Sequence, residues 1–280
     1  LLLFKLIFES GVVKFTYFGS GGTNTWLDLT ALNYHYWTQP IPSWISWYFH
    51  WLPQWFHKLA LLITYAVELI LPFFIFLPRR LKNIAVAGLM FLQVMIIITG
   101  NYGFFNLLTV LLCLSLLDDQ TVPSSIRMFF EPKNNENYRI GRSRRLQSAV
   151  GALVLFMLVW TGCYYLRLDL RGNRSNITGA SISPSGVTRS MIRSARYSRS
   201  MNSYGLFRVM TTTRPEIIIA HSSDGENWTP YHFQYKPVAL QMPPRFFFPH
   251  MPRLDWQMWF EALYIERIMD AQFSLSMYKR

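Results

Sequence analysis

Three ionisable side chains stand inside long apolar runs, where either chemistry or ion pairing would explain them. Glu9 and Lys14 lie in the run at residues 1–16, and Glu68 lies in the middle of residues 59–78. A charge in hydrocarbon is costly, so such groups pair with one another or mark functional sites. We interpret Lys14 as the partner of Glu68 or of Glu9, or as a lysine that extends its ammonium to the membrane interface. A lysine general base is the catalytic alternative.

Three histidines suggest metal chemistry, and they share one aromatic segment. His35, His50 and His57 lie within residues 26–60, together with six tryptophans and several prolines. Their separations of 15 and 7 residues match no common ligand pattern. Because tryptophan and tyrosine prefer the membrane interface, the segment predicts an interfacial aromatic layer rather than a metal or catalytic histidine site.

Other reactive residue types form no catalytic pattern. Asp118 and Asp119 follow an apolar run and are interpreted as a helix end facing water. Cys113 and Cys163 both lie inside apolar runs, where a thiol behaves as a small hydrophobic group. The sequence contains no glycine-rich phosphate loop or serine nucleophile elbow. It therefore predicts no catalytic residue, no cofactor and no metal.

These groups must be positioned by membrane helices. The chain is 51% hydrophobic and 17% aromatic, which is too apolar for an ordinary soluble domain. About 20 apolar residues cross a bilayer core. An α-helical membrane bundle of about five spans is predicted, the first one partial; the segments are 1–16, 59–78, 83–100, 101–117 and 147–166. The short segment 101–117 could instead be re-entrant. The missing initiator Met indicates a longer polypeptide, truncated at least at its N-terminus.

Loop charges predict an orientation for this bundle. The net charge is +12; the turn 79–82 carries three basic residues and the linker 118–146 carries six. Residues 17–57 contain neither Lys nor Arg. By the positive-inside rule, the two basic loops face the cytosol or matrix. Residues 17–57 and everything after about 167 then lie on the opposite side.

The part after the last span divides into a linker and a small domain. Residues 167–203 are rich in Arg and Ser and predict a solvated linker rather than a headgroup or nucleic-acid contact. Residues 204–280 predict a β-rich luminal domain, because short β-branched runs are separated by turn signals. Three sequons, all on the side predicted to be non-cytosolic, are glycosylation candidates: Asn173, Asn176 and Asn227.

An aromatic stretch near the C-terminus predicts an amphipathic helix that closes this domain. Trp256, Trp259, Phe260 and Leu263 follow the i, i+3, i+4, i+7 spacing of one apolar helix face. Arg253 and Asp255 would form a local ion pair. We interpret this helix as a structural plug that possesses an apolar docking face rather than as an active site.

Several long motifs together resemble the lipase maturation factor family. They occur in the family's order over nearly the whole chain: "LTALNYHYWTQPIP", "FLPRRL", "TGNYGFFNLLTVLLCLSLLDD", "YGLFRVMTTTRPEIII", "SDGENWTPYHFQYKP" and "PHMPRLDWQMWF". The resemblance implies a multi-spanning protein of the endoplasmic reticulum with a luminal C-terminal domain. It implies a non-enzymatic role, in which the protein helps client proteins such as secreted lipases to fold and assemble. The family also resembles, distantly, the membrane domain of the vitamin K-dependent carboxylase, which is its only link to catalysis.

Three functional interpretations remain open from the sequence. In the first, a folding or assembly factor contacts membrane lipid and a lipase-like client; its client or packing surface comprises His35, Trp44, Trp47, Trp51, Arg253, Asp255, Trp256, Trp259 and Phe260. In the second, the chain is a structural accessory subunit of a larger membrane complex, for example in the mitochondrial inner membrane. The third is an intramembrane enzyme that uses Lys14 and a histidine. Nucleic acid is not an expected partner.

Overall fold

The computed structural model describes residues 1–19, 22–118, 121, 142–173, 184–197, 202–236, 245 and 251–277. The chain forms two compact units, and each is assembled from separate stretches of sequence. The first unit comprises Leu1–Asn24, Tyr65–Val86 and Cys113–Val209, and the second comprises Thr25–Thr64, Ala87–Leu112 and Met210–Arg280. Residues distant in sequence therefore meet within each unit.

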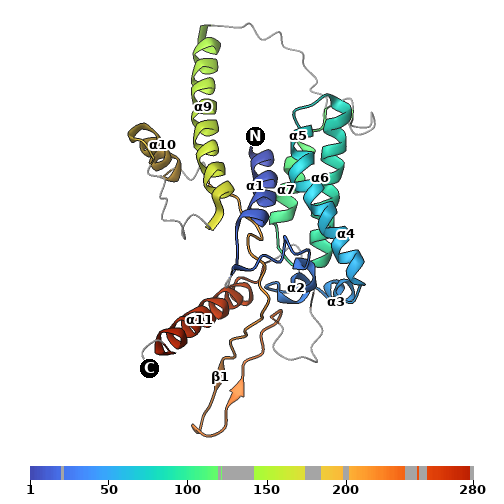
Figure 1. Cartoon of the computed structure of the whole chain (residues 1–280), viewed down its shortest axis with the longest axis vertical. Helices are drawn as coiled ribbons and strands as arrows, with labels where there is room; N and C mark the ends of the chain where they lie inside the picture. The colour runs from blue at the N-terminus through green and yellow to red at the C-terminus, as the bar shows by residue number, and fades with distance from the viewer. Residues whose placement is uncertain are drawn as a thin grey trace. The chain divides into compact units, whose positions relative to one another are not determined.

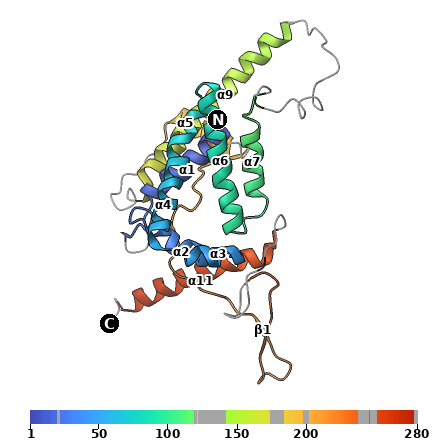
Figure 2. The ribbon, with the colours of Figure 1, turned by 90° about the vertical axis from the view of Figure 1, so that its right-hand side faces the viewer.

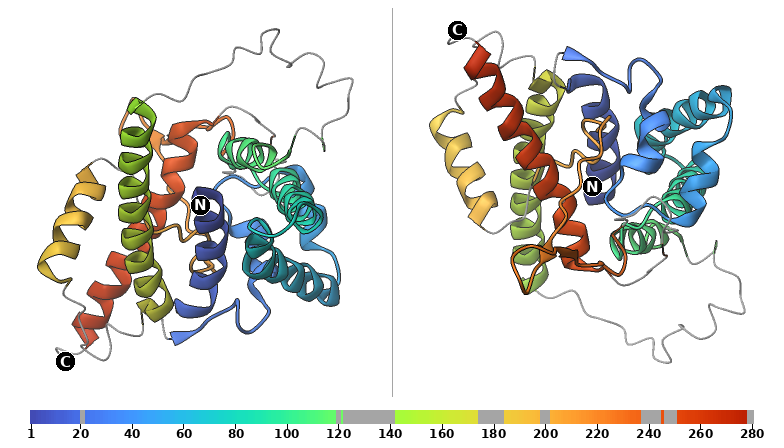
Figure 3. Two further views of the ribbon diagram at one scale, coloured as in Figure 1. Left: turned by 90° about the horizontal axis from the view of Figure 1, so that it is seen from above. Right: turned by 90° about the horizontal axis from the view of Figure 1, so that it is seen from below.

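The first unit is built around helix α1 (Leu2–Thr16). This helix lies beside α9 (Arg142–Arg171), as Figures 1 and 3 show, and it also packs on η2 (Ala66–Ile70) and α5 (Leu71–Phe74). Helix α10 (Gly186–Tyr197) lies along α9. The phenylalanine rings of α1 and α5 form an aromatic cluster, with the centroids of Phe8 and Phe73 5.1 Å apart.

The second unit combines short helices with the C-terminal part of the chain. Its helices are α2 (Ala31–Thr38), α3 (Trp44–His50), α4 (Gln54–Tyr65), α7 (Phe105–Leu114) and α11 (Arg253–Met277). Helices α2, α3 and α11 are seen together in Figure 2. Helix α6 (Arg79–Thr99) contributes residues to both units.

Three helices of the described residues are long and apolar enough to cross a membrane. They cover Gln54–Phe74, Arg79–Thr99 and Gln147–Arg171. The prediction of about five spans is therefore not confirmed. Helix α1 has 15 residues, which at about 1.5 Å per residue is shorter than a hydrocarbon core of about 30 Å. Segment 101–117 contains only the ten-residue helix α7, because Gly103 adopts a left-handed conformation (φ 62°) just before it.

The first of these spans changes its helical pitch around Glu68. Residues Ala66–Ile70 form one turn of π-helix between α4 and α5. Pro72 lies two residues after this turn; it has no backbone N–H, and its ring crowds the carbonyl four residues earlier, that of Glu68. The wider π-helical turn accommodates the absence of the backbone hydrogen bond that Pro72 cannot donate. Single π-turns within α-helices often occur at functional sites.

Gly11 allows α1 to approach this wide turn closely. A Cβ atom on Gly11 would lie 2.7 Å from Leu69 Cδ2 and 3.0 Å from Glu68 Cβ. We expect Gly11→Leu to destabilise the protein by about 1–3 kcal/mol through overpacking. The measurement is thermal unfolding in detergent, with Gly151→Leu on α9 as the control, because a Cβ at Gly151 meets no atom within 4 Å. Equal melting temperatures for the two variants would contradict the close approach.

The region predicted to be β-rich forms one small hairpin among the described residues. Strand β1 (Ala220–His221) pairs antiparallel with β2 (Thr229–Pro230) in the register Ala220↔Pro230 (Figure 1). The run at 206–213 is not a strand. Pro215 and Pro230 remove ladder donors, and the N–H groups of Tyr235 and Lys236 donate to Asp255 instead. The β-propensity of these runs was thus overridden by tertiary contacts.

The turn between the two strands is closed by Asp224. Its Oδ1 accepts hydrogen bonds from the N–H groups of Glu226 and Asn227, at 3.0 and 2.8 Å. These bonds, above all those from Asn227, hold the pKa of the Asp224 carboxyl well below its usual range. The Asp224 side chain therefore orders the turn by accepting hydrogen bonds from nearby backbone N–H groups.

The two predicted linkers contain helical structure. Helix α9 continues to Arg171, and α10 occupies Gly186–Tyr197 within the segment predicted to be a solvated linker. Most of the linker 118–146, including Asp119, lies outside the described residues. Asp118 is exposed and pairs with Lys82 Nζ at 2.8 Å.

Helix α11 buries a face shifted by one residue from the one predicted. Among the side chains of this helix that the structure describes, Asp255, Met258 and Ala262 are buried, Trp256, Trp259 and Leu263 are half-buried, and Phe260 is half exposed. Asp255 turns inward to accept backbone N–H groups, and among the described residues it forms no ion pair with Arg253. A buried carboxylate with backbone donors therefore sets the orientation of the helix, and this cannot be seen from hydrophobic spacing.

Candidate functional site

The carbonyl groups at the C-terminal end of α2 accept several hydrogen bonds from side chains of the second unit. Backbone carbonyls at a helix C-terminus have no partner within the helix. The Arg214 guanidinium supplies donors here: Nη1 donates to Trp37 O (2.9 Å) and to Gln39 O, and Nη2 donates to Pro40 O (3.1 Å). Trp259 Nε1 donates to the remaining carbonyl, Thr38 O, at 2.8 Å. Two side chains from the C-terminal part of the chain therefore complete α2.

A chain of charges fixes Arg214 in this position. Glu216 accepts from Arg214 Nε at 2.8 Å and pairs with Lys236 Nζ at 2.5 Å. Lys236 is buried, and its own N–H and that of Tyr235 donate to Asp255 of α11. Burial lowers the pKa of the Arg214 guanidinium, and Glu216 opposes that shift. The arrangement compensates a buried cation with a carboxylate, as an uncompensated charge here would be costly.

Gln39 links the same turn to the segment after α6. Its Nε2 donates to Tyr36 O (3.1 Å) and Thr99 O (2.8 Å), and its Oε1 accepts from the Tyr102 hydroxyl at 3.0 Å. The Tyr102 ring meets the edge of Trp256 at 5.8 Å between centroids. Trp256 thus packs against Tyr102, and Trp259 donates to Thr38 O of the aromatic segment.

The histidines of this segment have structural surroundings. His57 is buried, with Nδ1 2.9 Å from Asn33 Oδ1 and Nε2 2.9 Å from Phe49 O, so both ring nitrogens are engaged. His35 is buried and stacks near Tyr102, with centroids 6.4 Å apart. In the described part of the chain, no three His, Cys, Asp or Glu residues gather as metal ligands would.

Beside this buried framework lies an exposed aromatic stripe. Its five residues are between 51% and 68% exposed: Trp44, Trp47, Tyr48, Trp51 and Trp55. Trp44, Trp47, Tyr48 and Trp51 follow a spacing of three and four residues along α3 and its C-cap, and their rings contact one another as Trp44–Tyr48 and Trp47–Trp51, with centroids 6.3 and 5.6 Å apart. Trp55 stands at the start of α4. Trp44, Trp47 and Trp51 were predicted as surface candidates, whereas Tyr48 and Trp55 were not. We call these five residues the tryptophan stripe.

The first unit brings together two of the predicted intramembrane charges. Lys14 Nζ lies 2.5 Å from Glu68 Oε2 and also donates to Ser10 O at 2.9 Å. Both side chains are buried. Glu9 lies elsewhere, 3.5 Å from Lys5 Nζ. Lys5 was missed by the sequence reasoning, although its i, i+4 spacing from Glu9 was the available signal.

A second polar cluster in this unit holds residues 202–208 against the helices. Glu9 Oε2 accepts from Tyr204 N at 2.9 Å, and Lys5 Nζ donates to Asn202 O at 2.6 Å. On α9, Asp169 accepts from Ser203 Oγ at 2.8 and 2.7 Å. The charges of α1 and α9 therefore bind backbone and side chains of a distant segment, which no local pattern reveals.

Comparison with known proteins now places this arrangement in a family. Sequence models of the lipase maturation factor transmembrane domain and C-terminal domain match residues 1–124 and 200–280. The chain belongs to the lipase maturation factor family. It is 34% identical to lipase maturation factor 2 of Xenopus tropicalis and 31% identical to the human protein, in both cases over 94% of this chain and 48% of the relative. It is 31% identical to bovine lipase maturation factor 1, over 93% of this chain and 46% of the relative.

This lipase maturation factor family member thus spans about half the length of the curated relatives that it matches. No solved structure matches it. The two family domains share the second unit, because the α2 end comes from the transmembrane domain and Arg214 and Trp259 come from the C-terminal domain. The contacts around α2 are therefore contacts between the two family domains.

The sequons of this family member differ in accessibility. Asn227 is exposed in the hairpin turn, where its side chain donates to Asp224 Oδ2 at 2.7 Å. Asn173 Nδ2 donates to Phe18 O at 2.6 Å in a half-buried position. Asn176 lies outside the described residues. Asn227 is the more accessible of the two described acceptors.

Proposed function

We propose that this chain is a non-enzymatic, membrane-embedded factor that assists the folding or assembly of lipase-class clients. The observation that carries the proposal is the tryptophan stripe, a surface of five exposed aromatic residues. Contiguous exposed apolar surface is uncommon on monomers and marks partner or membrane sites. Tryptophan and tyrosine are also the residues that concentrate binding energy at protein interfaces.

Contacts of α3 and α4 support this role by holding the stripe rigid. Ser43, the N-cap of α3, donates to Ile98 O at 3.0 Å and accepts from Ser46 N at 3.2 Å. His57 ties α4 back to Phe49 on α3. A rigid aromatic surface loses little conformational entropy on binding, which favours affinity.

The test is maturation of a secreted lipase in cells that lack the endogenous factor. We expect Trp47→Ala combined with Trp51→Ala to reduce secreted lipase activity at least fivefold without lowering the amount of the factor. The matched control is Trp228→Ala, a tryptophan of the same unit with 65% exposure, against 68% for Trp51. Unchanged lipase activity in the double variant, or an equal loss in the control, would refute the proposal.

We place the protein in the endoplasmic reticulum membrane. The relatives carry the maturation-factor name, which describes assistance rather than catalysis and agrees with a non-enzymatic role. The comparisons give no support to the mitochondrial accessory subunit considered from the sequence.

Glycosylation provides a direct test of this location. We expect Asn227 to carry an N-glycan, because its sequon is exposed and lies after the last candidate span. Asn227→Gln should then abolish the mobility shift that an endoglycosidase produces. Asn173→Gln is the control, and it should leave that shift in place. A wild-type protein that the endoglycosidase does not change would contradict the luminal placement of this hairpin.

A further inference from the structure

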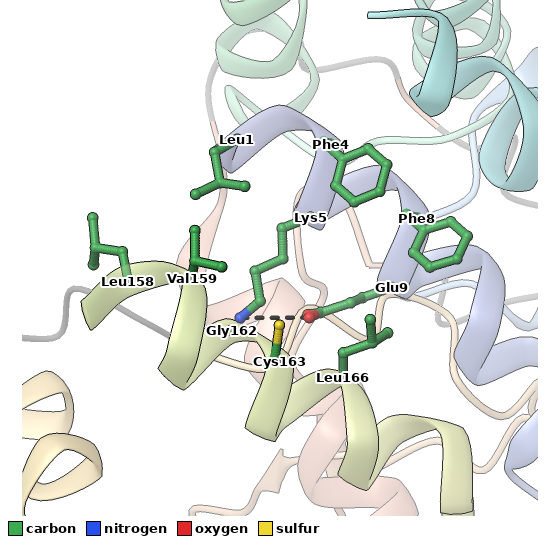
Figure 4. Close-up of a pocket in the computed structure, with 10 residues that line it drawn as sticks. All are labelled: Leu1, Phe4, Lys5, Phe8, Glu9, Leu158, Val159, Gly162, Cys163 and Leu166. Atoms are coloured by element: carbon green, nitrogen blue, oxygen red, sulfur yellow. Dashed lines mark ion pairs between the residues drawn. The ribbon is translucent and has the colours of Figure 1, made fainter. Parts of the chain in front are cut away.

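We propose that a cavity between α1 and α9 binds a neutral single-chain lipid whose hydroxyl headgroup donates a hydrogen bond to Glu9. The cavity has a volume of about 90 Å³. This is the share of roughly three water molecules at ~30 Å³ each, so it accommodates a small headgroup. Its polar residues are Lys5 and Glu9, shown in Figure 4 beside the apolar side chains of both helices.

The wall of the cavity suits an acyl chain. Apolar side chains form most of it: Leu1, Phe4, Phe8, Leu158, Val159 and Leu166. Val159 is 43% exposed, so the cavity opens at the surface of the helix pair. Helix α9 belongs to a candidate membrane span, which places this opening within reach of lipid. A chain lying between the two helices would cover apolar surface from both.

Glu9 supplies the specific element of the site. Its side chain is only 1% exposed. Oε2 accepts from Tyr204 N, whereas Oε1 has no hydrogen-bond partner among the described residues. A buried acceptor without a donor is costly, so a ligand that brings a donor gains affinity. Oε1 faces the Lys5 ammonium at 3.5 Å, which is beyond a normal hydrogen bond.

The neighbourhood of Lys5 selects an uncharged headgroup. Lys5 Nζ already donates to Asn202 O and lies 5.1 and 5.3 Å from the ring centroids of Tyr165 and Tyr204. Its charge is balanced by Glu9. A fatty-acid carboxylate would face the Glu9 carboxylate, and an ammonium headgroup would add a second cation beside Lys5. A hydroxyl donates to Oε1 without changing the charge of the site.

Photolabelling of the purified protein in nanodiscs tests this site. The probe is a monoacylglycerol with a diazirine in its acyl chain, and the comparison probe is the methyl ester of the same fatty acid, which has no donor. We expect the monoacylglycerol to label peptides of α1 and α9 at least tenfold more than the ester. Equal labelling by both probes would show that no hydroxyl is recognised and would overturn the proposal.

Two glycine variants and the maleimide labelling of a native thiol test the proposal further. Gly162→Leu fills the cavity and should remove labelling, whereas Gly151→Leu on the same helix should not, since Gly151 faces open space. Cys163 lines the cavity and is exposed, so monoacylglycerol should slow its maleimide labelling at least threefold. Wild-type labelling in Gly162→Leu would overturn the proposal. Absence of labelling in the wild type would do the same.

Discussion

Arg214→Ala is expected to lower the free energy of unfolding of the second unit by about 3 kcal/mol. Breaking one partner of a buried ion pair costs about 3–5 kcal/mol, and Glu216 keeps Lys236 as its second partner, so we expect the lower end. Three carbonyls at the end of α2 would also lose their donors. The measurement is denaturant unfolding in detergent, followed by hydrogen exchange of the amides in α2 and α3.

Arg214→Lys is the informative companion variant. Lysine keeps the charge but cannot present several N–H groups in a fixed plane, so it should recover only part of the lost stability. Full recovery would show that charge alone is needed. Wild-type stability of Arg214→Ala would show that the carbonyls of Trp37 and Pro40 do not depend on the guanidinium.

The second large effect is expected at Lys14 and Glu68. Lys14→Met or Glu68→Met alone should destabilise the first unit by about 3–5 kcal/mol, because each leaves a partner buried and uncompensated. The double variant Lys14→Met, Glu68→Met should lose less than either single change. A double-mutant cycle of thermal unfolding in detergent measures this coupling.

The surface pair Lys82–Asp118 provides the matched control. Its two side chains are 18% and 48% exposed, so Lys82→Met should cost about 0–1 kcal/mol. Additive losses at Lys14 and Glu68 would contradict a coupled pair. A Lys14→Met, Glu68→Met protein that still supports lipase maturation would also eliminate a general-base role for Lys14.

The local patterns predicted some parts of this structure well. Apolar runs identified the three candidate spans, since hydrophobic length is read directly from the sequence. The density of tryptophan in residues 26–60 predicted an interfacial aromatic layer that includes Trp44, Trp47 and Trp51, which the structure leaves exposed. These features depend on neighbours in the chain, so a single sequence contains them.

Other features depend on contacts between distant residues. Arg214, Glu216 and Lys236 belong to no local pattern of the sequence, and only the fold shows that they meet α2 and α11. Asp255 fixes the orientation of α11 by accepting hydrogen bonds from the N–H groups of Tyr235 and Lys236. The spacing of the apolar residues in α11 does not reveal this. Asp169 is likewise buried by a segment 34 residues later. Tertiary partners of this kind leave no periodic signal.

The completion of α2 by Arg214 and Trp259 has a consequence for biosynthesis. The residues that these side chains contact precede them by 177 and 221 positions. Contacts of such long sequence separation form late, and segments that await them remain prone to wrong association. During translation, the carbonyls at the end of α2 therefore lack these two donor side chains until almost all of the described chain has emerged. A protein proposed to assist the assembly of others therefore completes the C-terminal end of its own helix α2 only after its C-terminal part has been made.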